Sequence, residues 1–281
     1  MASRLRSPWI LLLPSIVLMT ALFGWPLVQG VFTAFRDGQG FTIANWQRLF
    51  DDPYFFASLR NTLLLIVIVV PIQLVLAIAM ALLLQARPKF AGGHFYLWCL
   101  PLAISELAAG LVWLSIFGNR GYLNSLLVSL GLSHDGVQWL NYQNTGTMLL
   151  AVVLAEIWRA TALVFVIVVA GVQMIPRDYD EAAQVFGAKF WQRLRHVTLP
   201  MLGPSLQVAL ILRTILALQA FAVAQALTGR DFPLLVGETY QWYSNLQNPG
   251  VASAVSLVVL AISLGTAVFY LRTVRQPKGA R

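Results

Sequence analysis

The chain has 281 residues, of which 58% are hydrophobic and only 11% are charged. This composition is too apolar for a soluble domain, and it predicts an all-α protein that crosses a membrane several times. The formal net charge of +8 does not indicate nucleic acid, because the cations lie at the ends of apolar stretches rather than on one aromatic-rich face. The single cysteine excludes an intrachain disulfide, and the three histidines show no ligand spacing, so we expect no metal.

Six stretches approach the roughly 20 mostly apolar residues that a membrane-spanning helix needs. They are Trp9–Val31, Asn61–Gln85, Phe95–Phe117, Thr147–Val172, Ser205–Leu227 and Val251–Leu271. We take the first as a retained span rather than a signal peptide, because it is long and has no clear small-residue cleavage site. No soluble segment interrupts the series, so residues 1–281 are predicted to form one transmembrane domain.

Positive charge predicts the orientation of this domain. Arg and Lys are more frequent in the two termini and in the loops around Arg87 and Lys189 than in the remaining loops. The positive-inside rule therefore places both termini in the cytoplasm. The opposite loops are rich in Trp, Tyr, Asn and Gln, as in Trp139–Asn144. Such residues suit anchoring at the membrane interface, and they equally suit docking of an extracytoplasmic protein.

A polar segment, residues 173–204, interrupts the apolar chain between the fourth and fifth stretches. Pro176 ends the fourth stretch, and the acidic residues that follow favour the first turn of a short helix. Gly187 breaks that helix, and Lys189–His196 can form a second one. Leu199–Pro200 and Pro204 are then expected to redirect the chain into the fifth stretch.

The aromatic residues Phe186, Phe190 and Trp191 lie at the glycine elbow of this loop. Exposed aromatic side chains surrounded by charges can fill a pocket on another protein. They can also rest on lipid headgroups, since basic and aromatic residues favour the membrane interface. The local residues favour neither reading.

The loop resembles the EAA motif of ABC importer permeases, in which Glu-Ala-Ala precedes a glycine and a later hydrophobic-Pro pair. The matching residues are Glu181, Ala182, Ala183, Gly187, Leu199 and Pro200. The likeness to the maltose-type carbohydrate uptake subfamily extends over nearly the whole chain, including Leu12-Leu13-Pro14, Trp25-Pro26, Asn45-Trp46, Asp52-Pro53, Arg60-Asn61-Thr62, Trp158-Arg159 and Leu227-Thr228-Gly229. The last two pieces are similar to the first of the two permeases in such systems.

Two departures from the subfamily pattern stand out. Gln184-Val185-Phe186 occupies positions where the subfamily often has an isoleucine and an aspartate. Leu227-Thr228-Gly229-Arg230 lacks the glycine-rich continuation common there. The first departure lies in the contact with the ATPase that such a loop makes, and the second in the external surface for the binding protein.

The resemblance implies the type I ABC importer permease fold, in the cytoplasmic membrane of a bacterium. It further implies a second related permease, two cytoplasmic ATPase subunits and an extracytoplasmic sugar-binding protein as partners. Residues 173–204 would insert into a cleft on one ATPase, with Glu181 pairing with a basic residue, Gly187 forming the elbow, and Phe186, Phe190 and Trp191 filling the cleft.

Four ionisable side chains fall inside the apolar stretches, where a charge costs at least a few kcal/mol and normally faces a partner or a water-filled path. They are Glu106, Glu156, Arg159 and Arg213. Glu156 and Arg159 are three residues apart on one helical face, so we expect a structural ion pair. Arg213 and Glu106 have no local partner, so pairing across helices and contact with a substrate both stay open.

Gln219 and Gln225 lie on the fifth stretch and are further candidates for the translocation path. Their amides can hydrogen-bond the hydroxyls of a passing sugar or a neighbouring helix. A neutral sugar needs no fixed charge in its path. The subfamily suggests a disaccharide such as maltose or trehalose, while glycerol phosphate or another polyol derivative is the alternative.

We expect no enzyme in this chain. It has no glycine-rich loop ending in Gly-Lys-Ser/Thr, so ATP and Mg²⁺ would be bound by the partner ATPase. There is also no convincing set of nucleophile, base and orienting residue. Two other functions stay open: a proton-coupled secondary transporter that uses Glu106 or Glu156 as its carrier, and a membrane-embedded scaffold or sensor that uses the polar loop only for docking.

Overall fold

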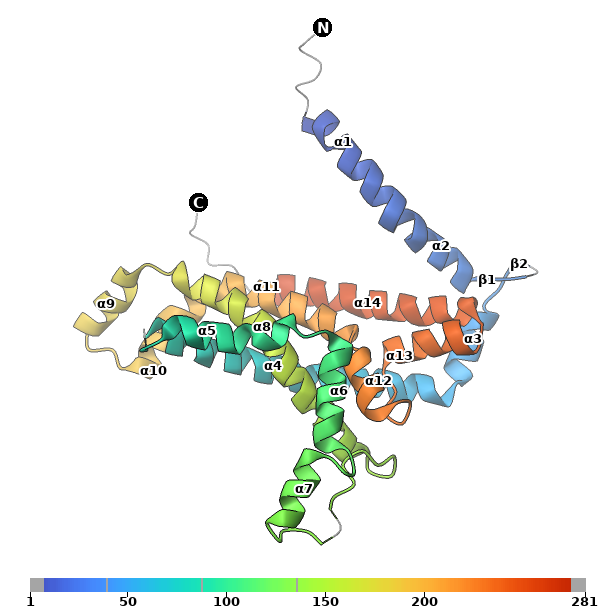
Figure 1. Ribbon diagram of the computed structural model, residues 1–281. Coiled ribbons are helices and arrows are strands. Elements are labelled where there is room, and N and C mark those ends of the chain that lie inside the picture. Colours follow the sequence, from blue (N-terminus) through green and yellow to red (C-terminus); the bar gives the residue numbers. More distant parts are fainter. Residues whose placement is uncertain (1–7, 39, 87, 135, 274–281) are drawn as a thin grey trace. The chain divides into compact units, whose positions relative to one another are not determined.

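The computed structural model describes residues 8–38, 40–86, 88–134 and 136–273, and helices dominate this part of the chain (Figure 1). The predictions that concern Arg87 and both chain termini lie outside the described residues. The described residues fall into two compact units. The first lies within Met1–Phe56 and Glu238–Leu260, and the second within Ala57–Gly237 and Ala261–Arg281.

The first unit begins with a long apolar helix, and a small β-hairpin follows that helix. Helices α1 (Pro8–Met19) and α2 (Trp25–Ala34) are joined without a break by a π-helical turn, and nothing in their most apolar window is buried. Strands β1 (Arg36–Asp37) and β2 (Gly40–Phe41) pair antiparallel, with Arg36 opposite Phe41. The exposed apolar surface of α1 and α2 suits lipid or another membrane subunit.

Asn45 holds the end of α2 in place. This residue lies on α3 (Ala44–Asp51), and its amide nitrogen donates to the carbonyls of Thr33, Ala34 and Arg36 at 3.4, 3.3 and 3.0 Å. It thereby satisfies carbonyl groups that a helix end leaves without partners. Elsewhere in this unit, the indole Nε1 of Trp242 donates to Asp52 at 3.1 Å.

Four of the six predicted spans are single helical runs in the structure. They are Leu11–Ala34, α4 (Pro53–Gln85), α8 (Thr145–Gln173) and α14 (Pro249–Thr273). These helices are long and apolar enough to cross a membrane, as the sequence predicts. The remaining two spans differ from the expected straight helices.

The third span is bent. Helix α5 (Ala91–Cys99) continues as a 3₁₀ turn to Ala103, and the chain then turns by 98° into α6 (Glu106–Phe117), which α7 (Tyr122–Ser129) follows. Ile104 and Ser105 are extended at the bend, and the hydroxyl of Ser105 accepts a hydrogen bond from the Ala108 amide at 3.2 Å. A serine in this conformation starts a new helix, which is why the apolar run does not stay straight.

The fifth span is also interrupted, at a different place from the one expected. After α9 (Arg177–Val185), the chain is helical from α10 (Phe190–Arg193) through a π-helical turn, Leu194–Thr198, into α11 (Leu199–Leu218). The expectation that Leu199–Pro200 redirects the chain is therefore wrong. The amide of Leu199 bonds to the carbonyl of Leu194, five residues back, and this wider turn keeps the helix continuous ahead of Pro200. The break comes later, at Gln219–Phe221, before α12 (Ala222–Thr228) and α13 (Leu235–Tyr240).

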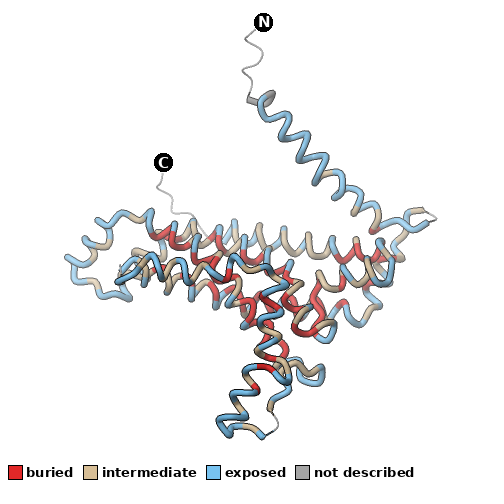
Figure 2. Tube along the Cα trace, in the orientation of Figure 1, coloured by how far each residue is buried: buried red, intermediate tan, exposed pale blue. Residues whose placement is uncertain are grey.

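The core of the second unit is built around α8, which carries much of the burial in Figure 2. One apolar cluster joins α8 to α4, α6 and α12 through residues such as Val152, Ala109 and Val223. The other joins α8 to α4, α5 and α11 through residues such as Phe165, Ala77 and Leu202. Helix α8 therefore packs against the helices of both interrupted spans.

Candidate functional site

The polar loop between α8 and α11 has the predicted form of two short helices with a glycine elbow. Pro176 precedes α9, and Asp178 and Asp180 lie in its first turn, where negative charge favours a helix start. Gly187 has φ +78°, a left-handed conformation that glycine adopts at little cost. The amide of Ala188 then bonds back to the carbonyl of Ala183 at 3.0 Å, closing the end of α9.

Asp180 ties the two short helices together. Its carboxylate accepts hydrogen bonds from Gln184 at 2.8 Å and from the guanidinium of Arg193 on α10 at 3.0 Å. The amide of Lys189 donates to the side chain of Gln192 at 2.7 Å and so fixes the start of α10. This contact was not predicted from the sequence, although an acidic residue on one helix and a basic residue on the next were its visible signal. The elbow is therefore held at a defined angle.

The outer surface of this loop combines a free carboxylate with large apolar side chains. Glu181 and Ala182 are exposed, Ala183 is half-buried, and within the described chain Glu181 makes no hydrogen bond or ion pair. Phe186 is 89% exposed and Trp191 is 75% exposed. The rings of Phe190 and Trp191 meet edge to face, with 5.5 Å between their centroids. In the described part of the chain, no ring contact joins Phe186 to them. Pro200 is exposed in the first turn of α11.

A hollow of about 470 Å³ lies between the loop and the end of α4. Its wall includes the end of α4, the α9 face that carries Asp180 and Glu181, and the start of the continuous helix near Phe190 and Arg193. The hollow places charged and apolar groups side by side. A loop with such a hollow beside it can receive a side chain from a protein partner, and it can also insert its own side chains into that partner.

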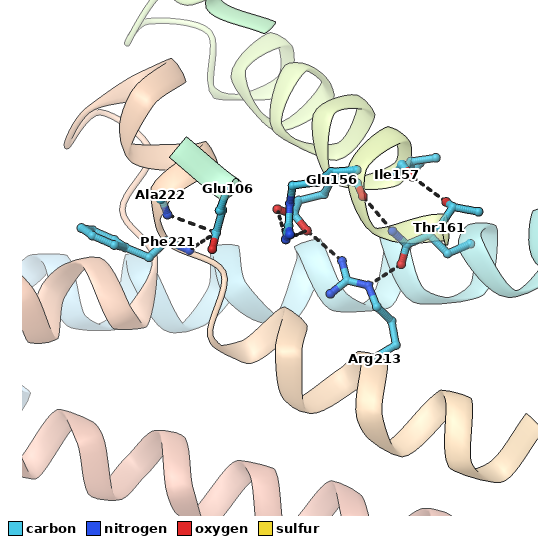
Figure 3. Close-up of polar contacts among 9 residues, drawn as sticks. Glu106, Glu156, Ile157, Thr161, Arg213, Phe221 and Ala222 are labelled. Atoms are coloured by element: carbon cyan, nitrogen blue, oxygen red, sulfur yellow. Dashed lines mark hydrogen bonds and ion pairs between the residues drawn. The ribbon is translucent and has the colours of Figure 1, made fainter. Parts of the chain in front are cut away.

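A buried polar cluster links three helices inside the second unit. The guanidinium of Arg213 on α11 contacts Glu156 on α8 at 2.9 Å and donates to the side-chain oxygen of Gln73 on α4. Gln73 in turn donates to the backbone carbonyl of Glu156 at 2.8 Å. All three side chains are almost completely buried. Figure 3 shows Glu156 and Arg213 facing one another.

The predicted pair of Glu156 and Arg159 is present, with 3.2 Å between the charged groups. Glu156 is thus shared by two guanidinium groups, of which Arg159 is partly exposed and Arg213 is not. The structure supplies the cross-helix partner that Arg213 lacks in its own neighbourhood. Gln73, which the sequence analysis did not single out, was detectable as a lone amide within an apolar stretch.

Glu106, the first residue of α6, meets the second interrupted span. Its carboxylate accepts hydrogen bonds from the backbone amides of Phe221 and Ala222 at 3.0 and 3.1 Å (Figure 3). These two amides belong to the start of α12. Glu106 therefore has partners across helices, and they are backbone groups rather than a charged side chain.

Gln219 and Gln225 are both exposed, but they do not lie on one regular helix. Helix α11 ends at Leu218, so Gln219 belongs to the break and Gln225 to α12. The expected single span over Ser205–Leu227 is therefore broken between the two glutamines. Within the described residues, no group of three or more His, Cys, Asp or Glu side chains could hold a metal ion.

Comparison with known proteins identifies the family of this chain. Residues 8–278 match the family described as "Binding-protein-dependent transport system inner membrane component". The chain belongs to that family, and thus to the permease subunits of ABC importers. The resemblance seen in the sequence is confirmed.

Two relatives illustrate the range within this family. The chain is 31% identical to the sulfoquinovosyl glycerol transport system permease protein SmoG of Agrobacterium fabrum, over 95% of this chain and 89% of that protein. It is 34% identical to the trehalose/maltose transport system permease protein MalF of Thermococcus litoralis, over 69% of this chain and 66% of that protein.

A solved structure shares the fold. A chain of a bacterial ABC transporter involved in the import of the acidic polysaccharide alginate superposes with a TM-score of 0.84. The match covers 98% of each chain at 21% sequence identity. This likeness confirms the type I importer permease fold.

Proposed function

We propose that this chain is a permease subunit of an ATP-driven importer that takes up a carbohydrate delivered by an extracytoplasmic binding protein. A second permease and two ATPase subunits, which bind ATP and Mg²⁺, complete the complex. The observation that carries this proposal is the exposed loop of α9, Gly187 and α10, whose shape is fixed from within.

The loop has the properties that a docking element needs. Asp180 and Arg193 hold its two helices, so little conformational freedom is lost when a partner binds. Phe186, Phe190 and Trp191 supply exposed aromatic surface of the kind that dominates protein interfaces. The charge of Glu181 is free to pair with a basic residue of the ATPase, as the EAA resemblance implies. We place the loop and both termini in the cytoplasm.

The translocation path is proposed to include the interruption of the fifth span. Irregular backbone at membrane depth is tolerated only where protein covers it or where it lines a water-filled cavity. Gln219 and Gln225 are exposed at and just beyond this interruption, and their amides can donate to and accept from sugar hydroxyls. Transporters commonly place substrate sites at such discontinuous helices.

A neutral sugar, such as the disaccharides trehalose and maltose, is the substrate that the charges favour. Glu156 is paired with Arg159 and Arg213, and Glu106 is bonded to backbone amides. The described charges at membrane depth are therefore engaged within the subunit. The name of the MalF relative supports this choice.

An anionic carbohydrate is the second candidate. Two guanidinium groups share the single carboxylate of Glu156. The Nε of Arg159 and one Nη of Arg213 have no hydrogen-bond partner among the described residues. Arg159 is also partly exposed. The names of SmoG and of the alginate importer point to substrates of this kind.

Copurification and uptake test the proposal. The tagged chain is expected to bring down a second permease and an ATPase in stoichiometric amounts from native membranes. Reconstituted with its binding protein, the complex should accumulate sugar only with ATP, and a protonophore should have no effect. Uptake that continues without ATP and collapses with the proton gradient would contradict the proposal and favour a secondary transporter. Competition between neutral and anionic sugars separates the two substrate classes.

A further inference from the structure

Glu106 bridges the two interrupted spans of the second unit. It begins α6 directly after the extended residues Ile104 and Ser105, where the third span turns. Its carboxylate accepts from Phe221 and Ala222, where the fifth span resumes as α12. Glu106 and Phe221 are 115 residues apart in the sequence, so no local pattern foretells this contact.

The two helices that Glu106 joins are in direct backbone contact one turn further on. A Cβ atom placed on Gly110 of α6 would lie 2.7 Å from the Cβ of Ala226 and 3.1 Å from the Cα of Val223, both on α12. Any larger residue at Gly110 would force α6 and α12 apart. Ala109, Val223 and Leu227 are buried together beside this contact. The carboxylate thus acts at one end of a tightly packed pair of helices.

Glu106 supplies a hydrogen-bond acceptor for the start of α12 that the neighbouring residues in the sequence do not supply. The first amides of a helix have no partner within the helix, and an unsatisfied amide at membrane depth costs several kcal/mol. The side chain of Phe221, which precedes α12, cannot cap it, and no local side chain does so. One side-chain oxygen of Glu106, Oε1, accepts from both of these groups. The point at which α12 starts therefore depends on Glu106.

We infer that Glu106 is a positioning residue of the translocation path. By fixing the start of α12, it holds the break that presents Gln219 and the helix that presents Gln225. The inference rests on the proposed function for its consequence in transport, while the positioning itself is a property of the fold. Glu106 acts through the backbone of α12, and contact with substrate is not part of its role.

Thiol labelling of the assembled complex tests the positioning without measuring transport. Gln219→Cys is placed in a Cys99→Ala background, and the rate of its reaction with a small water-soluble maleimide is measured. Glu106→Ala is expected to change this rate at least threefold, because the break is no longer held. Glu106→Gln keeps an acceptor oxygen and should stay within about twofold of the parent. Leu107→Ala, on the neighbouring exposed residue of α6, is the matched control and should leave the rate unchanged.

Two outcomes of the labelling experiment overturn the positioning role of Glu106. An unchanged rate in Glu106→Ala overturns the inference, and so does a Glu106→Gln variant that behaves like Glu106→Ala, because charge rather than the acceptor would then be required. If Glu106→Ala does not accumulate, Glu106→Asp takes its place. Its carboxylate is one carbon too short for the two amides, so the same threefold change is expected, and an unchanged rate again overturns the inference. Failure of ATP-driven uptake in the parent complex would contradict the proposed function and leave the labelling result standing.

Discussion

Glu156 is the residue on which the buried polar contacts of the second unit converge. Breaking a buried ion pair by removing one partner typically costs 3–5 kcal/mol, because the other charge is left without compensation. The two partners of Glu156 differ, however, since Arg159 is partly exposed and Arg213 is not. The two ends of the pair are therefore not equivalent.

This asymmetry yields the first prediction. In Arg213→Leu, Glu156 still has Arg159 at 3.2 Å, whereas in Glu156→Leu the buried guanidinium of Arg213 keeps only its bond to Gln73. Glu156→Leu is therefore expected to lower the free energy of unfolding of the purified complex by about 1–2 kcal/mol more than Arg213→Leu does. The double variant should recover part of the loss. A larger loss in Arg213→Leu would contradict this account and point to a role for Arg213 outside the cluster.

Gln219 carries the second prediction. Its side chain is exposed at the break and makes no hydrogen bond within the described chain, so its removal should not disturb the fold. Gln219→Ala is expected to lower the rate of sugar uptake about fivefold, which corresponds to one amide hydrogen bond of about 1 kcal/mol. Assembly and ATPase activity should be unchanged. Leu216→Ala, an exposed apolar truncation on α11, is the control, and an equal loss there would remove Gln219 from the path.

At the scale of elements, the α9–α10 loop is defined by one backbone conformation and one ion pair. Gly187 needs a positive φ, which costs a non-glycine residue roughly 1–2 kcal/mol and which proline cannot adopt. Glu181 takes part in none of the contacts that hold the described loop. Shape and partner contact can thus be altered separately.

The third prediction uses this separation. Gly187→Pro and Glu181→Lys are both expected to reach the membrane at parental levels while ATP-driven uptake falls at least tenfold. The first change distorts the elbow, and the second reverses the charge offered to the ATPase. Gly187→Asn is the matched control, because asparagine enters the left-handed region readily and should keep most of the activity. Normal uptake by Gly187→Pro at parental expression would contradict the assignment of the loop.

At the scale of the whole molecule, the orientation in the membrane follows from charge. The fourth prediction is that Lys189→Cys, in a Cys99→Ala background, reacts with an impermeant thiol reagent only from the cytoplasmic side. Tyr142→Cys, in the exposed loop before α8, should react only from the opposite side. The reverse pattern of labelling would invert the topology and remove the coupling argument.

Much of the architecture could be predicted because it depends on short stretches of sequence. The length of an apolar run decides that it spans a membrane, and Pro176 and Gly187 act within a turn or two of their own positions. The pair of Glu156 and Arg159 belongs to the same kind, since three residues separate its members. The polar loop was predictable for this reason, apart from the tie made by Asp180.

The tertiary structure decided what depends on distant residues. Glu156 meets Arg213 across 57 residues, Arg213 meets Gln73 across 140, and Glu106 meets Phe221 across 115. The breaks at Ile104–Ser105 and Gln219–Phe221 persist because other helices satisfy or cover the backbone groups that the breaks release. A sequence pattern shows that an apolar run is long enough to span, but only packing against other helices determines whether that run stays straight.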